Sequence, residues 1–346
     1  MSEILKNLIE INTINDKENE KIRDYIKNLL KDKDFDFQEI GTKKEKVLIA
    51  KRKNPKVAFC CHTDTVDKSV YWTKEALKLT EDDENYYGLG VSDMKGGTAA
   101  LLEVITTIPK NIPCMACFTY DEEISFKGIA DLIKNNISLP DTIIFPEPTD
   151  LQPAIANKGC IEFSVKFNGK SAHSSTPDLG ENALYKALDF IKELKEFAAE
   201  LSKEKNSLYE VAYTTFNLSK ITGGNEINKV PDTCEITFDF RTIIREHNQK
   251  IIEQVEQLTK KYQATATILN NLNAALNKNK EVIEKIEAIT NQKAIGLNYV
   301  TEASFLPDKN IIVLGPGPIT AHQKDEKIKK ESFNKCQEIY KKIICN

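Results

Sequence analysis

The stretch VAFCCHTDTVD, residues 57–67, decides how this sequence is interpreted. Its first five residues form an unbroken apolar run, which is typical of a strand buried on both faces of a parallel sheet. His62, one of only four histidines in 346 residues, stands where that run ends, and Asp64 follows two residues later. Open α/β sheets bind ligands at the carboxyl ends of their strands, so this pair is placed where a functional site is expected.

The sequence around this stretch alternates between short apolar strands and amphipathic helices. We expect strands at 46–52, 114–120 and 141–146, and helices that begin near Lys95 and near Phe126. Two further helices are expected at 2–10 and 18–31. This alternation predicts an α/β fold with a central, mostly parallel sheet and helices on both of its faces.

The pattern changes near residue 160. CIEFSVKFNG (160–169) and CEITFDFRT (234–242) alternate apolar and polar residues with period two, and helices are expected at 181–203 and 245–261. Half-solvated strands combined with two helices predict a small ferredoxin-like α+β domain. Because the first pattern returns with a final apolar strand and helix, we expect this domain, 159–271, to be inserted into a discontinuous domain formed by 1–158 and 272–346.

Composition excludes several classes of function. The 48 basic and 52 acidic residues are well mixed along the sequence and give a net charge of −4. The sequence therefore lacks the clustered positive charge that is typical of nucleic-acid-binding proteins. No run approaches the roughly 20 apolar residues that span a bilayer, and no secretory signal is visible, so a cytoplasmic protein with no membrane partner is expected. The eight cysteines show no Cys-x-x-Cys spacing, and we interpret them as reduced and mostly buried. The expected partner is a small molecule.

Further acidic and imidazole side chains follow the other expected strands of the first domain or precede its helices. They are Asp93, Glu122, Glu123, Glu147 and His322. Each alone has an ordinary structural explanation; an aspartate before a helix, for example, is usually an N-cap. Together at one rim they would repel one another without a counter-charge, which metal ions supply.

Imidazole and carboxylate ligands without thiolates suit zinc or a similar divalent ion at a catalytic site. So few ligands hold two ions about 3.5 to 4 Å apart only if one carboxylate bridges them, and a water between the ions would then be the nucleophile. His62 is the expected ligand in the opening stretch. Asp64 is expected to accept the proton on its other ring nitrogen and so fix the tautomer.

Eight motifs, in order along nearly the whole chain, carry a family resemblance: HTDTV, YGLGVSDMKGG, DEE, PEPT, NKG, AHSS, NKVP and GPGPITAHQKDE. The chain resembles the di-zinc deacylase and exopeptidase family, which includes acetylornithine deacetylases, succinyl-diaminopimelate desuccinylases, aminoacylases and dipeptidases. Within the family, HTDTV, YVTEASF and GPGPITAHQKDE are most similar to the acetylornithine deacetylase branch.

The resemblance implies a role for each residue of the rim. His62 and Glu147 would hold one zinc ion, Glu123 and His322 the other, and Asp93 would bridge them; Co²⁺ or Mn²⁺ could substitute. Glu122 would be the general base, which requires a pKa raised toward neutrality. His173 of AHSS would stabilise the oxyanion in the partner subunit of a homodimer formed through the inserted domain.

Three further residues are expected to contact substrate. Asn228 and Arg241 resemble family residues that meet the substrate, and the planar guanidinium suits a bidentate clamp on a carboxylate. Glu302, on the segment that leads to the strand before His322, is expected to bind a distant ammonium group. His247, at the start of a helix, is expected to face solvent.

The expected reaction is hydrolysis of N2-acetyl-L-ornithine, a step of arginine biosynthesis, to L-ornithine and acetate. A desuccinylase acting on succinyl-diaminopimelate, or a di-zinc dipeptidase or carboxypeptidase, remains an alternative within the family. A third hypothesis is a non-enzymatic protein that keeps the fold but binds no metals. The presence of every expected metal ligand argues against this hypothesis.

Overall fold

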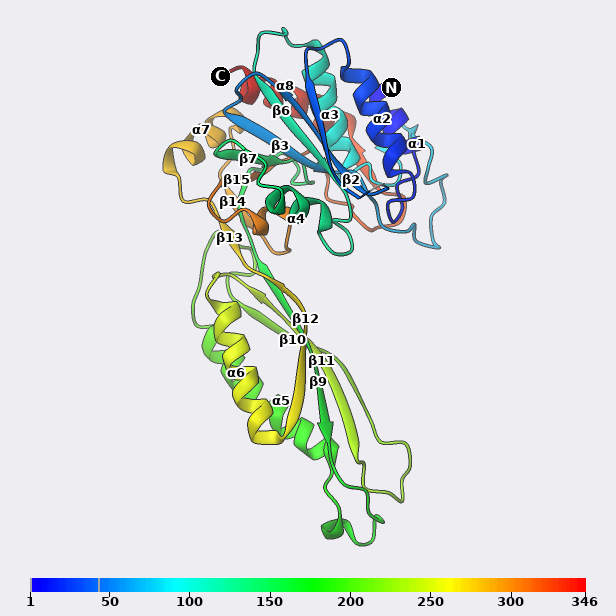
Figure 1. The fold of residues 1–346 in the computed structure, drawn as a ribbon, viewed down its shortest axis with the longest axis vertical. Helices are drawn as coiled ribbons and strands as arrows, with labels where there is room; N and C mark the ends of the chain where they lie inside the picture. Colours follow the sequence, from blue (N-terminus) through cyan, green and yellow to red (C-terminus); the bar gives the residue numbers. More distant parts are fainter. Residues whose placement is uncertain (1, 43) are drawn as a thin grey trace. The chain divides into compact units, whose positions relative to one another are not determined.

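The computed structural model describes residues 2–42 and 44–346, and the chain forms two compact units (Figure 1). Unit 1 comprises Met1–Ile155, Asn277–Ile295 and Phe305–Asn346. Unit 2 comprises Ala156–Leu276 and Gly296–Ser304. The grouping of Gly296–Ser304 with unit 2 differs from the division expected from the sequence, because that stretch has no strand periodicity to link it with the inserted segment.

The largest sheet, most of whose strands belong to unit 1, has the strand order β1-β2-β6-β3-β7-β15-β8-β13, and β14 pairs with β8. Its four central strands, β6, β3, β7 and β15, run parallel to one another, and antiparallel strands flank them. The strands of this sheet are β1 (Asp36–Gly41), β2 (Lys46–Arg52), β3 (Val57–His62), β6 (Cys114–Thr119), β7 (Thr142–Phe145), β8 (Ala154–Asn157), β13 (Ala275–Leu276), β14 (Ile295–Leu297) and β15 (Asn310–Val313). A small second sheet, in the order β16-β5-β4, is formed by β4 (Thr80–Glu81), β5 (Asn85–Tyr87) and β16 (Lys327–Lys329).

The main core of unit 1 lies between one face of this sheet and a layer of helices. Alternate strand residues such as Leu48, Phe59 and Phe118 are buried in the same cluster as the apolar faces of four helices. These helices are α1 (Glu3–Glu10), α2 (Asn19–Leu30), α3 (Lys95–Thr107) and α8 (Lys330–Cys345). The shorter helix α4 (Lys127–Lys134) packs against β1 and β2, and α7 (Lys280–Thr290) contacts α8. The fold class predicted for this part, a central mostly parallel sheet covered by helices, is confirmed.

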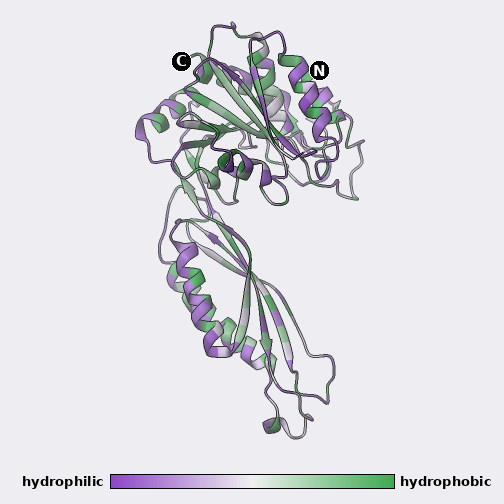
Figure 2. Cartoon of the chain, in the orientation of Figure 1, coloured by the Kyte–Doolittle hydropathy of each residue, from purple (hydrophilic) through white to green (hydrophobic). Residues whose placement is uncertain are grey.

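Burial of the central strands explains why they read as continuous apolar runs. All six residues of β6 are buried, as are five of the six in β3. Figure 2 shows these strands mostly in green, whereas the helices carry purple on their exposed sides. Seven of the eight cysteines are buried, and Cys345 is exposed. Their expected burial is therefore confirmed for all but one.

Unit 2 contains a four-stranded antiparallel sheet in the order β10-β11-β9-β12. Its elements are β9 (Gly159–Asn168), α5 (Ala183–Leu201), β10 (Thr215–Gly223), β11 (Thr233–Thr242), α6 (His247–Tyr262) and β12 (Ala264–Leu272), with the short helix η1 (Pro177–Leu179). The inward residues of β9 and β11, among them Phe163 and Phe238, share a core with α5 and α6. The other short helix of the unit, η2 (Glu302–Phe305), ends in unit 1.

Among the described residues, no helix combines the length and the apolar character that crossing a bilayer requires.

Candidate metal centre

The parallel register of unit 1 places several strand ends at one edge of the sheet. His62 is the last residue of β3 and pairs with Thr119, the last residue of β6. The loop that follows β6 carries Glu122 and Glu123, and Glu147 follows the end of β7 by two residues. These side chains therefore start from the same edge of the sheet, as the sequence pattern predicts.

Two loops that are distant in sequence complete this edge. Asp93 lies two residues before α3, and His322 lies in the loop between β15 and β16. His322 has a φ angle of +59°, the left-handed conformation that is uncommon for residues other than glycine. Non-glycine residues held in this conformation often lie at functional sites.

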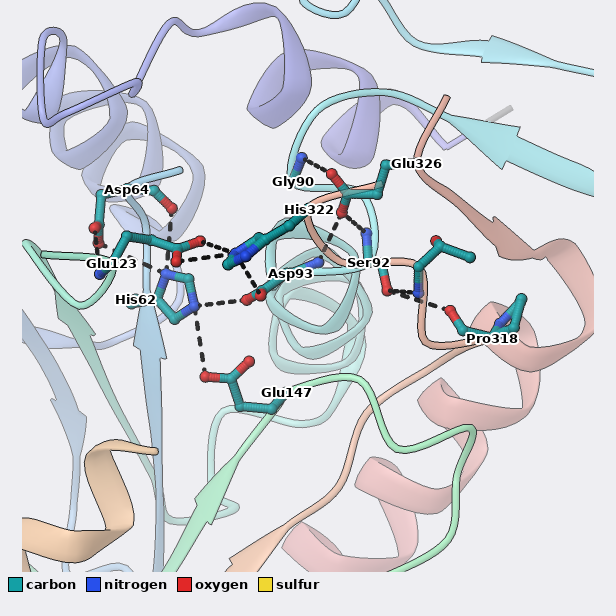
Figure 3. Close-up of polar contacts among 11 residues, drawn as sticks. His62, Asp64, Gly90, Ser92, Asp93, Glu123, Glu147, Pro318, His322 and Glu326 are labelled. Carbon is teal, nitrogen blue, oxygen red and sulfur yellow. Dashed lines mark hydrogen bonds and ion pairs between the residues drawn. The ribbon is translucent and has the colours of Figure 1, made fainter. Parts of the chain in front are cut away.

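A first cluster is centred on His62, which is fully buried. Its Nε2 atom lies 2.9 Å from Oδ1 of Asp93 and 3.5 Å from Oε1 of Glu147. Figure 3 shows both carboxylates facing the same edge of the ring. One ligand atom from each of these three residues lies within 4.8 Å of the others, a spacing that could hold a metal ion.

A second cluster is centred on His322, which is about half exposed. Its Nε2 atom lies 3.1 Å from Oε2 of Glu123 and 3.7 Å from Oδ2 of Asp93. The two oxygens of Asp93 thus face two different histidines, Oδ1 toward His62 and Oδ2 toward His322 (Figure 3). Asp93 is the residue shared by both clusters.

The donor set fits two divalent ions. Ligand atoms about 2.0 to 2.2 Å from a tetrahedral zinc ion lie roughly 3.3 to 3.6 Å from one another. The four histidine-to-carboxylate distances given above, 2.9 to 3.7 Å, bracket that spacing. All the donors are imidazole nitrogen or carboxylate oxygen, the ligand types typical of catalytic zinc and related ions.

Asp64 supports the site from behind His62. The Nδ1 atom of His62 lies 3.2 Å from the carbonyl oxygen of Asp64 and 3.6 Å from its Oδ1. Both oxygens favour a proton on Nδ1, so the neutral imidazole would direct the lone pair of Nε2 at the cluster. The other carboxylate oxygen, Oδ2, accepts a hydrogen bond from the backbone N–H of Glu123 at 3.1 Å. Asp64 therefore positions one residue of each cluster.

Crowding of like charges perturbs the titration of the site. Burial and then the charge of Asp93 raise the pKa of Glu147 to about 8. Burial would lower the pKa of His62, but Glu147 and the hydrogen bonds to Asp64 and Asp93 raise it well above its usual value. The hydrogen bond to Glu123 raises the pKa of His322 to about 9. Excess negative charge in a partly enclosed site is the condition that a bound cation relieves.

Glu122 belongs to neither cluster, although it precedes Glu123 directly. Burial, followed by the charges of Glu147, Asp93 and Glu123, raises its pKa well above the usual value for a carboxyl group. The two glutamates lie in the turn after β6, and adjacent side chains leave the backbone in different directions, so one carboxylate can ligate while its neighbour remains available. A carboxyl group with a raised pKa holds a proton more readily than usual, which a general base must do before it returns the proton.

Two of the remaining predicted residues lie side by side in unit 2. His173 is exposed, and its Nδ1 atom lies 2.8 Å from Oγ of Ser175. The following residue, Ser174, donates its N–H to the carbonyl oxygen of Asn228 at 3.0 Å. Asn228 is exposed as well.

Arg241 and Glu302 both belong to unit 2. The Nε atom of Arg241 donates to Oδ1 of Asp239 at 3.1 Å, and its Nη2 atom lies 3.8 Å from Glu162. A substrate carboxylate would therefore compete with two internal carboxylates for this guanidinium group. Glu302 is 1% exposed, within the short helix η2.

The expectation for His247 is wrong. Its side chain is fully buried at the start of α6, where Nδ1 lies 2.8 Å from Oγ1 of Thr214 and Nε2 lies 3.4 Å from Glu204. Burial lowers its pKa. A polar residue at the start of a helix is usually predicted to be exposed to solvent, but the first residues of α6 are buried.

Sequence reasoning gave no role to Glu326. This residue is 2% exposed, and its carboxylate accepts hydrogen bonds from the backbone N–H groups of Gly90, Ser92 and Asp93. Glu326 lies within the motif GPGPITAHQKDE. Its three backbone partners lie more than 230 positions earlier in the sequence, so no sequence pattern predicts these contacts. Glu326 lies four positions after His322, and that proximity was the only available signal.

Comparisons with known proteins agree with this geometry. Residues 155–267 match the family model described as a peptidase dimerisation domain. The chain is 33% identical to the acetylornithine deacetylase of Buchnera aphidicola subsp. Acyrthosiphon pisum (strain Tuc7), over 99% of this chain and 96% of that protein.

Solved structures show the same fold at lower identity. The chain matches a tripeptidase from Staphylococcus aureus with a TM-score of 0.79 and 21% identity, over 99% of this chain and 96% of that one. It matches an M20 family metallo-carboxypeptidase from Sulfolobus solfataricus with a TM-score of 0.78 and 17% identity, over 99% of both chains. The chain therefore belongs to the M20 family of metal-dependent amide hydrolases, in the group that contains the acetylornithine deacetylases.

Proposed function

We propose that this enzyme hydrolyses N2-acetyl-L-ornithine to L-ornithine and acetate as a cytoplasmic homodimer with two zinc ions per chain. The observation that carries the metal-dependent part is the arrangement of Asp93, whose two oxygens face His62 and His322 in separate clusters. The likeness to relatives named acetylornithine deacetylase over 99% of this chain supports the choice of substrate.

In this proposal the protein residues hold the site and move the proton. His62 and Glu147 would hold one ion, Glu123 and His322 would hold the other, and Asp93 would contribute to both. When bound, the ions polarise the amide carbonyl and lower the pKa of water. Glu122 takes the proton from the attacking water and returns it to the amine that leaves. Co²⁺ or Mn²⁺ can occupy the same set of nitrogen and oxygen donors.

The other residues bind the substrate and the transition state. Arg241 clamps the α-carboxylate of the substrate, which replaces Asp239 and Glu162 as its partner, and Asn228 donates a further hydrogen bond. Glu302 binds the distant ammonium group of ornithine. His173 stabilises the oxyanion in the site of the partner subunit, and the match of residues 155–267 to a dimerisation domain supports this homodimer.

The substrate is tested by the ratio of kcat/KM values for N2-acetyl-L-ornithine and N-succinyl-L,L-diaminopimelate, with a panel of dipeptides as a third arm. Specificity is a difference in transition-state binding, so this ratio measures it directly. We expect acetylornithine to lead by more than about tenfold, roughly 1.4 kcal/mol. A lead of that size for the succinylated substrate or for a dipeptide would overturn the deacetylase assignment and leave the family unchanged.

A further inference from the structure

We propose that Glu326 is the positioning residue that holds Asp93 in its bridging orientation and ties it to the loop of His322. This inference rests on the proposed function, because it concerns the assembly of the proposed two-ion centre. Glu326 itself is not placed as a ligand: it belongs to neither cluster among the described residues.

The contacts of Glu326 with the Asp93 loop are unusually dense for one carboxylate. Its Oε2 atom accepts the N–H of Gly90 at 2.8 Å, and its Oε1 atom accepts the N–H groups of Ser92 at 2.6 Å and Asp93 at 2.9 Å (Figure 3). The loop between β5 and α3 has no strand partner over these residues. A buried N–H without an acceptor is costly, so the conformation of this loop depends on the carboxylate of Glu326.

The backbone around Glu326 closes the loop that carries His322. The hydroxyl of Thr320 donates to the carbonyl oxygen of Lys327 at 2.7 Å and accepts the N–H of Lys327 at 2.9 Å. His322 lies between these two residues. Gly88 donates its N–H to the carbonyl oxygen of Glu326 at 3.2 Å, so main chain and side chain of Glu326 both contact the Asp93 loop.

A second contact joins the same two loops. Oγ of Ser92, the residue before Asp93, donates to the carbonyl oxygen of Pro318 at 3.2 Å and accepts the N–H of Thr320 at 3.4 Å. Asp93 and His322, which belong to the second cluster, therefore sit on two loops fastened together at their bases. The third member, Glu123, is held separately by Asp64. Loss of the Glu326 contacts should therefore affect the second cluster more than the first, since His62 and Glu147 lie at the ends of buried strands.

The neighbouring residue provides a matched control. Asp325 lies in the same loop, and its carboxylate accepts hydrogen bonds from the backbone N–H groups of Thr73 and Lys74 and from the hydroxyl of Thr73. It thus makes as many contacts as Glu326, but with a segment that bears no ligand. If tethering of the loop were all that mattered, Glu326→Gln and Asp325→Asn would have similar effects.

The test is calorimetric titration of the metal-free full-length chain with Zn²⁺. Glutamine keeps one acceptor oxygen, and its NH₂ group would face a backbone donor, so at least one of the three N–H groups loses its partner. We expect Glu326→Gln to weaken the weaker of two binding steps by about 10- to 100-fold, the usual scale for a residue that orients a ligand. The stronger step should change less, and Asp325→Asn should leave both steps within about twofold of wild type, well inside that scale.

Three further readouts separate positioning from general damage. The metal-free variants should keep the wild-type circular dichroism spectrum, and excess Zn²⁺ should restore most of the turnover of Glu326→Gln, because saturation compensates for weaker binding. Glu326→Asp keeps the charge but shortens the reach, so we expect an intermediate affinity; it decides the question if the glutamine variant does not fold. Wild-type affinities in both Glu326 variants, or equal losses in the Asp325 control, would overturn the inference. If wild type itself binds no metal, the proposed function fails first.

Discussion

Asp93 contacts both histidines of the centre, and the chemistry proposed for this protein depends on that single side chain. One of its oxygens lies 2.9 Å from His62 and the other 3.7 Å from His322. A carboxylate that faces two imidazoles in this way can contribute one oxygen to each of two ions, so fewer residues are needed to bind both ions. The hydrogen bond to His62 lowers the pKa of Asp93 against the opposing effect of burial, so this carboxylate stays ionised.

At the residue scale, the first prediction concerns Glu122. Replacement by glutamine keeps the shape of the side chain but removes its ability to accept a proton. We expect Glu122→Gln to bind both ions with wild-type affinity and to lose about 10²- to 10⁴-fold in turnover. Metal content by elemental analysis and steady-state kinetics measure the two effects. Wild-type turnover in this variant would assign the base to another residue.

A second prediction concerns Asp64, which orients His62 and the backbone of Glu123. Asp64→Asn should weaken metal binding by about 10- to 100-fold, because residues behind the ligands contribute on that scale. Asp67→Asn, on the exposed continuation of the same loop, is the matched control and should bind as wild type does. Equal metal affinity in Asp64→Asn and wild type would show that Asp64 does not orient the ligands.

At the scale of elements, a carboxylate of β1 holds helix α2 against the edge of the sheet. Glu39 receives Lys27 at 2.9 Å and Arg23 at 3.3 Å from α2, and Lys46 at 3.0 Å from β2. Burial opposes ionisation, but the hydrogen bonds to Lys27 and Lys46 prevail and lower the pKa of Glu39 to about 2. One acidic side chain on an edge strand thus joins three elements.

The third prediction follows from the sign of this shift. A carboxyl group whose pKa is lower in the folded state contributes stability above its unfolded pKa, and that contribution fades as the pH falls toward the folded value. Glu39→Gln should lower the free energy of unfolding by on the order of 1 kcal/mol near neutral pH. The difference should shrink as the pH falls from about 4.5 toward 2. Urea unfolding of both proteins at several pH values measures it, and a difference that grows with acidity would contradict the assignment.

The elements also show how far sequence patterns reach. The strands that precede His62 and Glu147 were predicted within a few residues, because their continuous apolar runs reflect burial on both faces of the sheet. The longer helices were predicted equally well, because most of them have one apolar face. Strand β10 was not located, since most of its residues are exposed and a bulge between Leu218 and Lys220 interrupts the alternation of its apolar residues. Short strands such as β4 and β5 are two and three residues long and have no periodicity to detect.

For the site, the same limit applies to individual residues. His62, Asp93, Glu123, Glu147 and His322 could be found because motif order and strand ends both point to them. The roles of Glu326 and of the second oxygen of Asp64 depend on backbone N–H groups brought close by the fold. A backbone donor is present at nearly every residue, so it leaves no signal in the sequence. The burial of His247 was missed for a related reason: its partner Thr214 lies 33 positions away.

At the scale of the whole molecule, the catalytic function is proposed to require two chains. Unit 2 carries the exposed His173 beside Asn228, and residues 155–267 match a dimerisation domain. All of the proposed metal ligands and Glu122 belong to unit 1. A histidine that acts on the partner subunit would divide each active site between two chains.

The fourth prediction tests that division by complementation. Homodimers of His173→Ala and of Glu122→Gln should each lose most of their activity. In a mixed dimer one site contains an intact Glu122 and an intact His173, so activity should return in half of the sites of that hybrid. Co-purification with two different affinity tags isolates the hybrid for kinetic assay. Absence of rescue, with the hybrid dimer intact, would show that His173 acts within its own chain or has no catalytic role.

The central claim is that two divalent ions bound by one set of residues enable amide hydrolysis, and metal reconstitution tests it most directly. Protein stripped by chelator is titrated with Zn²⁺ while bound metal and hydrolysis of N2-acetyl-L-ornithine are measured in the same samples. The account predicts no turnover without metal, a maximum near two ions per chain, and fewer ions bound at the same zinc concentration by Asp93→Ala. Full activity in the chelator-treated, metal-free protein would contradict it.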